Sequence, residues 1–375
     1  MTAWLPHARG QWIALLVGVI ALIACGLLGT RDTQQTLLSY LFAFFLFTGL
    51  SVGSMALLMV HALTGGAWGY YVRAPLLAAA RVLPLLAVAV IPILVCMHAL
   101  YPWTNAQAWM HHGQLRAQRW YLADEFFVIR TVVYFALWGG GLFACQRNLD
   151  DPIRLRRIAA PGLIVYALTT LLAATDWIIS LTPHWHSSIF GMMVGSGWIL
   201  VACALAVLCA CARKGSDAHP PHVLHDLGNL LLALVLAWAY LAFMQYLTVW
   251  VADLPGENAW YIPRTLTSWR RLAWFLIAFH FVIPFVLLLS REAKRRRNWL
   301  GTIAAMLLIA DIADAFWLVV PDFRTQGFAL RWTDLCAPLG LGALWLCAYL
   351  GQLRAMRLPV GPHPQAVTSM ERGHA

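Results

Sequence analysis

Ten apolar segments of about twenty residues, separated by short polar loops, constrain this chain more than any other feature of its sequence. A helix needs ~20 residues to cross a hydrocarbon layer of ~30 Å. These segments are too long and too uniformly apolar to be barrel strands. We therefore predict an all-α integral membrane protein with about ten transmembrane helices. The predicted spans are residues 11–29, 36–63, 76–100, 123–147, 158–181, 187–212, 227–253, 268–290, 299–320 and 333–353.

The composition supports a membrane protein. Charged residues make up only 11% of the 375 residues, whereas a soluble domain averages roughly 25%. The net charge of +10 does not indicate nucleic-acid binding, because most basic residues lie in short loops between apolar segments. We expect the first span to be a retained helix rather than a cleaved signal peptide. The third span is the least regular, and we expect a kink at Pro92.

The basic residues also predict the topology. Ten crossings place both termini on one side, here called side A, and the opposite side is side B. Sixteen Lys and Arg residues fall on side A and eight on side B, with Arg81 and Arg130 inside helices. We therefore predict a multi-pass protein of the bacterial inner membrane with both termini cytoplasmic. Residues 1–357 would form a single membrane domain, and residues 358–375 a disordered cytoplasmic tail.

An internal repeat is one interpretation of the middle of the chain. Helices 2–5 and 6–9 would share one orientation, related by an axis along the membrane normal. In that register Cys96–Trp103 faces Phe243–Trp250, and three of the eight positions are identical. Among apolar helices chance similarity explains this equally well, so both interpretations remain open.

Two carboxylates lie deep inside the ninth span. Asp311 and Asp314 are three residues apart, which places them on one helix face. Two carboxylates this close in a low dielectric do not both ionise easily, so one of them could carry a proton. The alternative is a structural pair bonded to Arg or Trp on a neighbouring helix.

Other ionisable or polar residues occur at membrane depth, where a charge costs about 2.5–3.5 kcal/mol. Asp176, near side B, could relay protons or contact a quinol, or it could bond to the loop that follows it. His280, in the middle of the eighth span, could relay protons or be simply hydrogen-bonded. His98 and Gln245, which would be its mate under the repeat interpretation, are candidates for quinone contact.

A further polar set lies toward side A. His61, Arg81 and Asp226 could form the cytoplasmic mouth of a proton path, and Arg81 could instead snorkel to the interface or pair with Asp226. For the charged residues near the side-B helix ends we expect a solvated interfacial role. They are Asp124, Glu125 and Asp253.

The sequence gives little sign of a bound metal. None of the eight cysteines has the CxxC spacing of a cluster or c-type haem site. The histidines within the spans lie at different depths, so they predict no bis-histidine haem. His184 and His186 share a short loop that offers too few other ligands. No nucleotide-binding or nucleophile motif occurs, and Gly139–Gly141 is expected to allow close helix packing.

Several stretches carry a resemblance to a known family. Asp176–Gly191 resembles a loop of the polysulfide-reductase-like (NrfD-like) quinol-oxidoreductase membrane subunits. Others are similar to the F-type membrane subunit of alternative complex III, a quinol:cytochrome c oxidoreductase. These stretches are Leu57–Gly66, Asp226–Ala233, Trp238–Tyr246, Leu254–Glu257 and Ala337–Gly342, within a resemblance that runs from about Leu41 to Leu353.

The resemblance implies two four-helix bundles, helices 2–5 and 6–9, flanked by helices 1 and 10. It implies a subunit without haem or cluster that conducts protons or contributes to a quinone pocket. The implied partners are a C-type membrane subunit, iron–sulfur and multihaem cytochrome c subunits, and a terminal oxidase. The proton candidates that it carries over are His61, Asp176, His280, Asp311 and Asp314.

The chain departs from the family pattern at three positions. Thr182 stands where the family has an acidic residue, His186 where it has Tyr or Phe, and Asn229 where it often has Lys. The first departure weakens a quinol role for the loop, and the last removes one expected partner of Asp226. Two alternatives to the proton-handling subunit are a structural anchor for redox subunits and a secondary transporter.

Overall fold

A computed structural model describes residues 8–105, 120–183, 185–213 and 219–356. His184 and the predicted tail, residues 358–375, lie outside these described residues. Within them, ten helical segments are long and apolar enough to cross a membrane, and none of the described residues forms a strand. The predicted fold class, an all-α membrane protein of about ten helices, is confirmed.

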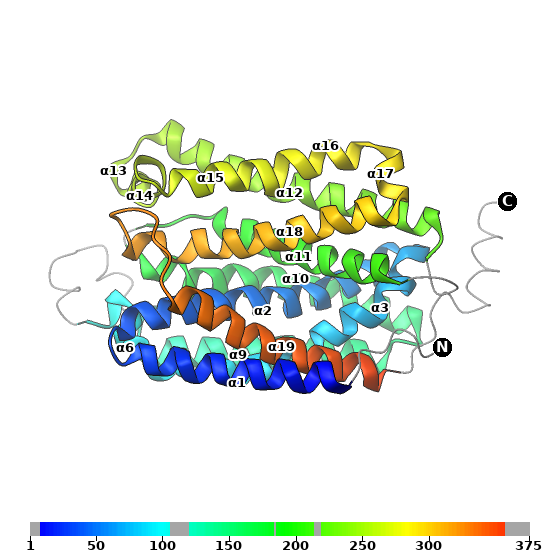
Figure 1. The fold of residues 1–375 in the computed structure, drawn as a ribbon, viewed down its shortest axis with the longest axis horizontal. Coiled ribbons are helices and arrows are strands. Elements are labelled where there is room, and N and C mark those ends of the chain that lie inside the picture. The colour runs from blue at the N-terminus through cyan, green and yellow to red at the C-terminus, as the bar shows by residue number, and fades with distance from the viewer. Residues whose placement is uncertain (1–7, 106–119, 184, 214–218, 357–375) are drawn as a thin grey trace.

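The helices run alternately between the two ends of a long bundle (Figure 1). Nine of the ten spans begin within six residues of the predicted start. The spans are α1 (Ala8–Gly29), α2 (Thr33–Thr64), α3 to α5 (Ala67–Ala80, Leu83–Ala89, Ile91–Val95), α9 (Asp124–Arg147), α10 (Pro152–Trp177), α11 (Phe190–Ala212), α12 (Pro221–Ala252), α15 to α16 (Arg270–Leu276, π-helical Ile277–Val282, Ile283–Leu289), α18 (Arg297–Val319) and α19 (Thr333–Ala355).

Short helices lie in the loops and at the helix ends. On side B these are α6, α13 and α14, at the left in Figure 1, and on side A α17, at the right. Their bounds are Met97–Leu100 for α6, Pro255–Asn258 for α13, Ile262–Leu266 for α14 and Arg291–Arg295 for α17, with 3-10 turns at Pro102–Thr104, Ile179–Leu181 and Pro321–Phe323.

The third span is more broken than the expected single kink at Pro92. It begins at Ala67, nine residues before the predicted start, and is interrupted at Arg81–Val82, at Val90 and at Cys96. Two of the interruptions precede Pro84 and Pro92. Proline lacks the amide hydrogen for a helical hydrogen bond and disfavours helical geometry in the residue before it. The span therefore changes direction in steps.

The packing agrees with two four-helix bundles. The first contains α2, α3 to α6, α9 and α10, and the second contains α11, α12, α15 to α16 and α18. The helices that begin the two bundles, α2 and α11, pack against each other at the centre, and α1 packs on α19 beside α2. Gly53 makes this central contact possible, because a Cβ there would lie 1.9 Å from the backbone oxygen of Trp198.

Arginines at side A donate hydrogen bonds to carbonyl oxygens where helices end. Arg156 donates to Leu63 at 2.7 Å, and Arg297 donates to the carbonyl of Arg213 at 2.9 Å. Arg73 donates to Leu149 in the same way. Leu63 lies in the last turn of α2, and Arg213 and Leu149 lie just after α11 and α9, where helix carbonyls lack internal donors.

Among the described residues, three arginine–aspartate pairs with side chains less than a tenth exposed occupy side B. Arg130 of α9 binds Asp176 of α10 through two nitrogens, at 2.8 and 2.9 Å. Arg264 of α14 binds Asp322 in the same two-point way, at 2.7 and 2.9 Å. The third pair, Arg324 with Asp334, is also bidentate, with both bonds at 2.8 Å. Such pairs fix geometry as well as charge.

Candidate functional site

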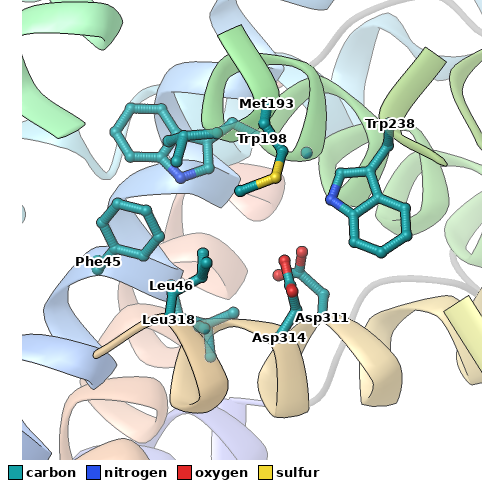
Figure 2. A pocket seen from close by; sticks show the side chains of 11 residues that line it. Phe45, Leu46, Met193, Trp198, Trp238, Asp311, Asp314 and Leu318 are labelled. Atoms are coloured by element: carbon teal, nitrogen blue, oxygen red, sulfur yellow. The ribbon is translucent and has the colours of Figure 1, made fainter. Parts of the chain in front are cut away.

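Asp311 and Asp314 lie on the inward face of α18, where it packs against α11. Each residue is less than a tenth exposed. Their carboxylates are close enough to interact with each other, and both point away from α18 into the space between Met193 and Trp238 (Figure 2). None of the ion pairs between described residues involves either carboxylate. The two acids are therefore buried together without a cation.

Trp238 of α12 faces the two acids. Its indole N–H faces the two carboxylates, and it interacts electrostatically with Asp314. Phe45, Met193 and Trp198 complete the surroundings, so the carboxylates lie in a largely apolar environment. One neutral donor compensates two carboxylates only in part, because a buried charge needs a partner charge or several hydrogen bonds.

The cavity beside the acids is small. About 10 Å³ in it is open to the centre of a water molecule, and one buried water needs roughly 10–15 Å³ and two to four polar partners. The site therefore matches a single water between the carboxylates. Pockets that bind small organic molecules measure about 300–1,000 Å³, so this cavity does not hold a quinone ring.

His280 packs against the ring of Trp238. It is fully buried, and neither ring nitrogen has a hydrogen-bond partner. Its ring lies on the indole, with centroids 4.0 Å apart and an interplanar angle of 35°. The residue sits in the π-helical turn Ile277–Val282, and π-helical turns inside α-helices occur frequently at functional sites.

The site thus joins three helices of the second bundle. Trp238 contacts Asp314 through its N–H edge and His280 through its ring face. Two carboxylates without a cation can share one proton between them, since both cannot easily be ionised in a low dielectric. The arrangement can therefore take up and release a proton inside the membrane.

Asp176 is placed differently. It is fully buried, and besides Arg130 it accepts a hydrogen bond of 2.6 Å from the hydroxyl of Tyr134. The guanidinium of Arg130 also lies 3.8 Å from the centre of the Tyr121 ring. The carboxylate thus has charge and hydrogen-bond partners of its own, which favours a structural role.

The side-A candidates do not gather into one cluster. His61 contacts the carbonyl of Gly66 at 3.0 Å and lies against the ring of Trp68. Asp226 lies 3.8 Å from His225. Arg81 ends α3, and no ion pair between it and Asp226 occurs among the described residues.

Lys294 reaches Asn229, the position at which the resemblance led us to expect a lysine. Its ammonium group donates to the Asn229 side-chain oxygen at 2.6 Å, and its stem packs against Gly228. A cation from α17 therefore stands next to the helix turn that carries Asp226.

The two quinone-contact candidates have different surroundings. His98 is mostly exposed and lies 3.6 Å from Asp124. Gln245 is buried on α12 and accepts a hydrogen bond from Ser187. Nothing in these contacts connects the two residues.

Sequence reasoning missed the partners in this region. Trp238, Arg264 and Asp322 were not among the candidate residues, and Arg130 was recognised only as a charge inside a helix. The available signal was the cost of a buried arginine, which predicts a nearby carboxylate. Among the described residues, no three His, Cys, Asp or Glu side chains gather as a metal site would require.

The fold and the site define a polytopic helical membrane protein with an unpaired acid pair in its second bundle. Searches with protein-family models and among curated proteins find no match to this chain.

Proposed function

We propose that this chain is a membrane subunit of a quinol-oxidising respiratory complex, similar to the F-type subunit of alternative complex III, and that it handles protons. The complex would lie in the bacterial inner membrane with both termini of this chain in the cytoplasm. Its partners would be a C-type membrane subunit, iron–sulfur and multihaem cytochrome c subunits, and a terminal oxidase. Quinol oxidation itself is assigned to the C-type partner.

The observation that carries the proton-handling role is the buried acid pair without a cation. The other buried aspartates of the described chain, Asp176, Asp322 and Asp334, each have an arginine partner. Asp311 and Asp314 do not, although a charge at this depth costs about 2.5–3.5 kcal/mol. A pair that shares a proton reduces this cost, and it also makes the site able to exchange that proton.

Trp238 and His280 extend the proposed path. The indole N–H stabilises a negative charge on Asp314, and His280 has both ring nitrogens free to receive or pass on a proton. One water in the cavity would connect the two carboxylates. Quinone enters this proposal only at the complex level, because the cavity is too small for its ring.

The architecture also supports the proposal. Two bundles of like orientation with α1 and α19 packed together beside them agree with what the resemblance implies. A secondary transporter of the repeat type would have broken helices at corresponding positions in the two halves. Here the third span is broken, but its counterpart α12 is continuous from Pro221 to Ala252.

The test is the double substitution Asp311→Asn, Asp314→Asn in the complete complex. Side-chain size is retained while the exchangeable proton is lost, so we expect normal assembly with a strong loss of proton release per quinol oxidised. The measurement is pH change during turnover in proteoliposomes. The matched control is Asp253→Asn, since this exposed residue has φ 46°, a conformation that asparagine also adopts.

The outcomes separate the proposals. Wild-type proton release and turnover in the double variant would refute the proton path. Loss of assembly with unchanged activity per intact complex would favour the structural anchor, in which buried charges only hold helices together. If the chain purifies alone from native membranes, without redox subunits, the membership in a respiratory complex is refuted.

A further inference from the structure

A groove opens between α4 and α9 on the first bundle, away from the acid pair. Its volume is about 240 Å³, and an engineered cavity of only ~150 Å³ already binds benzene. Leu83, Pro84 and Ala87 of α4 form one wall. The other wall is one face of α9, from Phe135 to Gln146.

Two local features create the groove. The third span changes direction at Arg81–Val82, just before Pro84, so α4 does not continue the line of α3. Opposite it, Gly139 has no side chain. The expectation that Gly139–Gly141 allows close helix packing is wrong for the first two glycines, because a Cβ at Gly139 or Gly140 would meet no atom within 4 Å. Only Gly141 faces a neighbouring helix, at Met59.

The α9 wall of the groove matches one leaflet in length. It covers residues 135–146, which at 1.5 Å per residue is about 16 Å. Half of a ~30 Å hydrocarbon layer is ~15 Å. The α9 wall therefore extends over the apolar part of the side-A leaflet from near the middle of the membrane, and the α4 wall, residues 83–87, faces about 6 Å of it.

The polarity of the groove also matches a lipid. Every side chain that lines it is apolar except Gln146, which lies at its side-A end in the last turn of α9. The next residue, Arg147, is exposed, and its guanidinium lies 5.0 Å from the ring centre of Phe143 on the groove rim. An amide and a cation thus stand where ester and phosphate groups would lie, at the end of an apolar helix face as long as the hydrocarbon part of one leaflet.

We propose that this groove binds one acyl chain of a phospholipid from the side-A leaflet, with the phosphate at Arg147 and an ester oxygen at Gln146. Dispersion contacts with the groove walls would hold the chain, since lipid tails gain little hydrophobic free energy from such a contact. The cation would favour an anionic headgroup. This site is independent of the proposed proton path.

The experiment is native mass spectrometry of the complex, or of the chain as purified, with phospholipids counted at increasing detergent exposure. In Gly139→Leu the leucine fills the groove, and in the control Gly140→Leu the same change is made at a glycine outside its lining. We expect the wild type and Gly140→Leu to retain a phospholipid that Gly139→Leu loses. Equal thermal stability of the two variants shows that both are folded.

A second arm tests the headgroup. In mixed anionic and zwitterionic detergent–lipid micelles, Arg147→Gln should lose the preference for the anionic lipid. The control Arg157→Gln removes an exposed side-A charge outside the groove and should keep it. Equal lipid retention in Gly139→Leu and the wild type overturns the proposal. The proposal is also overturned if Gly139→Leu alone loses a transmembrane partner or a quinone instead of a phospholipid.

Discussion

The two four-helix bundles bury acidic side chains in opposite ways. In the first bundle the buried face of α10 carries hydroxyls, such as Thr169 and Thr170, and its one carboxylate, Asp176, is bound by Arg130. In the second bundle Arg264 and Asp322 repeat this pair at the same end, but α18 adds Asp311 and Asp314 without a cation. The side-B end of each bundle therefore holds a neutralised pair, and the second bundle additionally buries two carboxylates without a cation.

The difference teaches what to look for in such a protein. Buried charge alone does not mark a functional site, because a well-bonded pair can serve only to fix the ends of helices. The informative feature is a buried carboxylate that lacks a cation, whereas the other buried aspartates of the described chain each have an arginine partner. Here that criterion selects Asp311 and Asp314.

The largest expected effect comes from breaking the buried arginine–aspartate pairs. Arg130→Gln leaves Asp176 buried without a cation, and Arg264→Gln does the same to Asp322. Loss of one partner of a buried pair costs about 3–5 kcal/mol, so we expect a fall of this size in the free energy of unfolding. Denaturant titration of the purified protein measures it.

The control for these variants is Arg331→Gln. Arg331 pairs with Asp32 at 2.9 Å, but both side chains are about half exposed. A surface pair contributes about 0–1 kcal/mol. If Arg130→Gln is no more destabilising than this control, the first bundle is not held by its buried pair.

The second prediction contrasts the acids directly. Neither acid has a cationic partner, so Asp314→Asn and Asp311→Asn leave no buried cation unpaired. We therefore expect the free energy of unfolding to change by less than about 1 kcal/mol or to rise. Asp176→Asn should cost about 3 kcal/mol, because it leaves Arg130 uncompensated. Equal losses for the three variants would remove the contrast between the bundles.

The third prediction concerns His280. Its two ring nitrogens are buried without partners, and an unsatisfied buried polar group costs about 1–3 kcal/mol. His280→Phe keeps an aromatic ring against Trp238, so we expect it to stabilise the protein by about 1 kcal/mol while proton release falls. If His280→Phe lowers the free energy of unfolding more than His280→Gln does, the imidazole makes a hydrogen bond that stabilises the packing of this helix.

Hydropathy was enough to predict the spans but not all of their ends. The third helix starts nine residues earlier than expected because Trp68, Tyr70 and Arg73 were interpreted as a loop. In the fold the two aromatic residues lie next to the α2–α3 turn, both against His61, and Arg73 donates to Leu149. A helix that ends among aromatic and basic side chains at the interface gives no clear hydropathy boundary.

The site was predictable only within one helix. The spacing of Asp311 and Asp314 indicates a shared face without any structure. Their neighbour Trp238 comes from another helix, 73 residues earlier, and no period in the sequence connects the two. The pairing of Arg130 with Asp176 depends in the same way on how α9 and α10 pack, so single-helix patterns could not reveal it.

The smallest expected effect tests the contact between the bundles at side A. His219, in the connection before α12, is buried against Tyr71 of α3, with ring centroids 4.8 Å apart. Burial, and then the nearby Arg213, lower the pKa of His219 from 6.5 to about 4. The folded protein therefore keeps this ring neutral, while the unfolded chain binds a proton below pH 6.5.

The contribution of the buried, neutral His219 ring to stability is accordingly complete above pH 6.5 and is lost as the pH falls toward 4. The loop lies at the water boundary, so we expect only about 0.5–1 kcal/mol of acid destabilisation from this residue. His219→Gln should flatten the stability profile between pH 6.5 and 4 by that amount. His222 is exposed in the first turn of α12. His222→Gln is therefore the control and should leave the stability profile unchanged. An identical profile in both variants would mean that His219 does not report on the contact between the bundles.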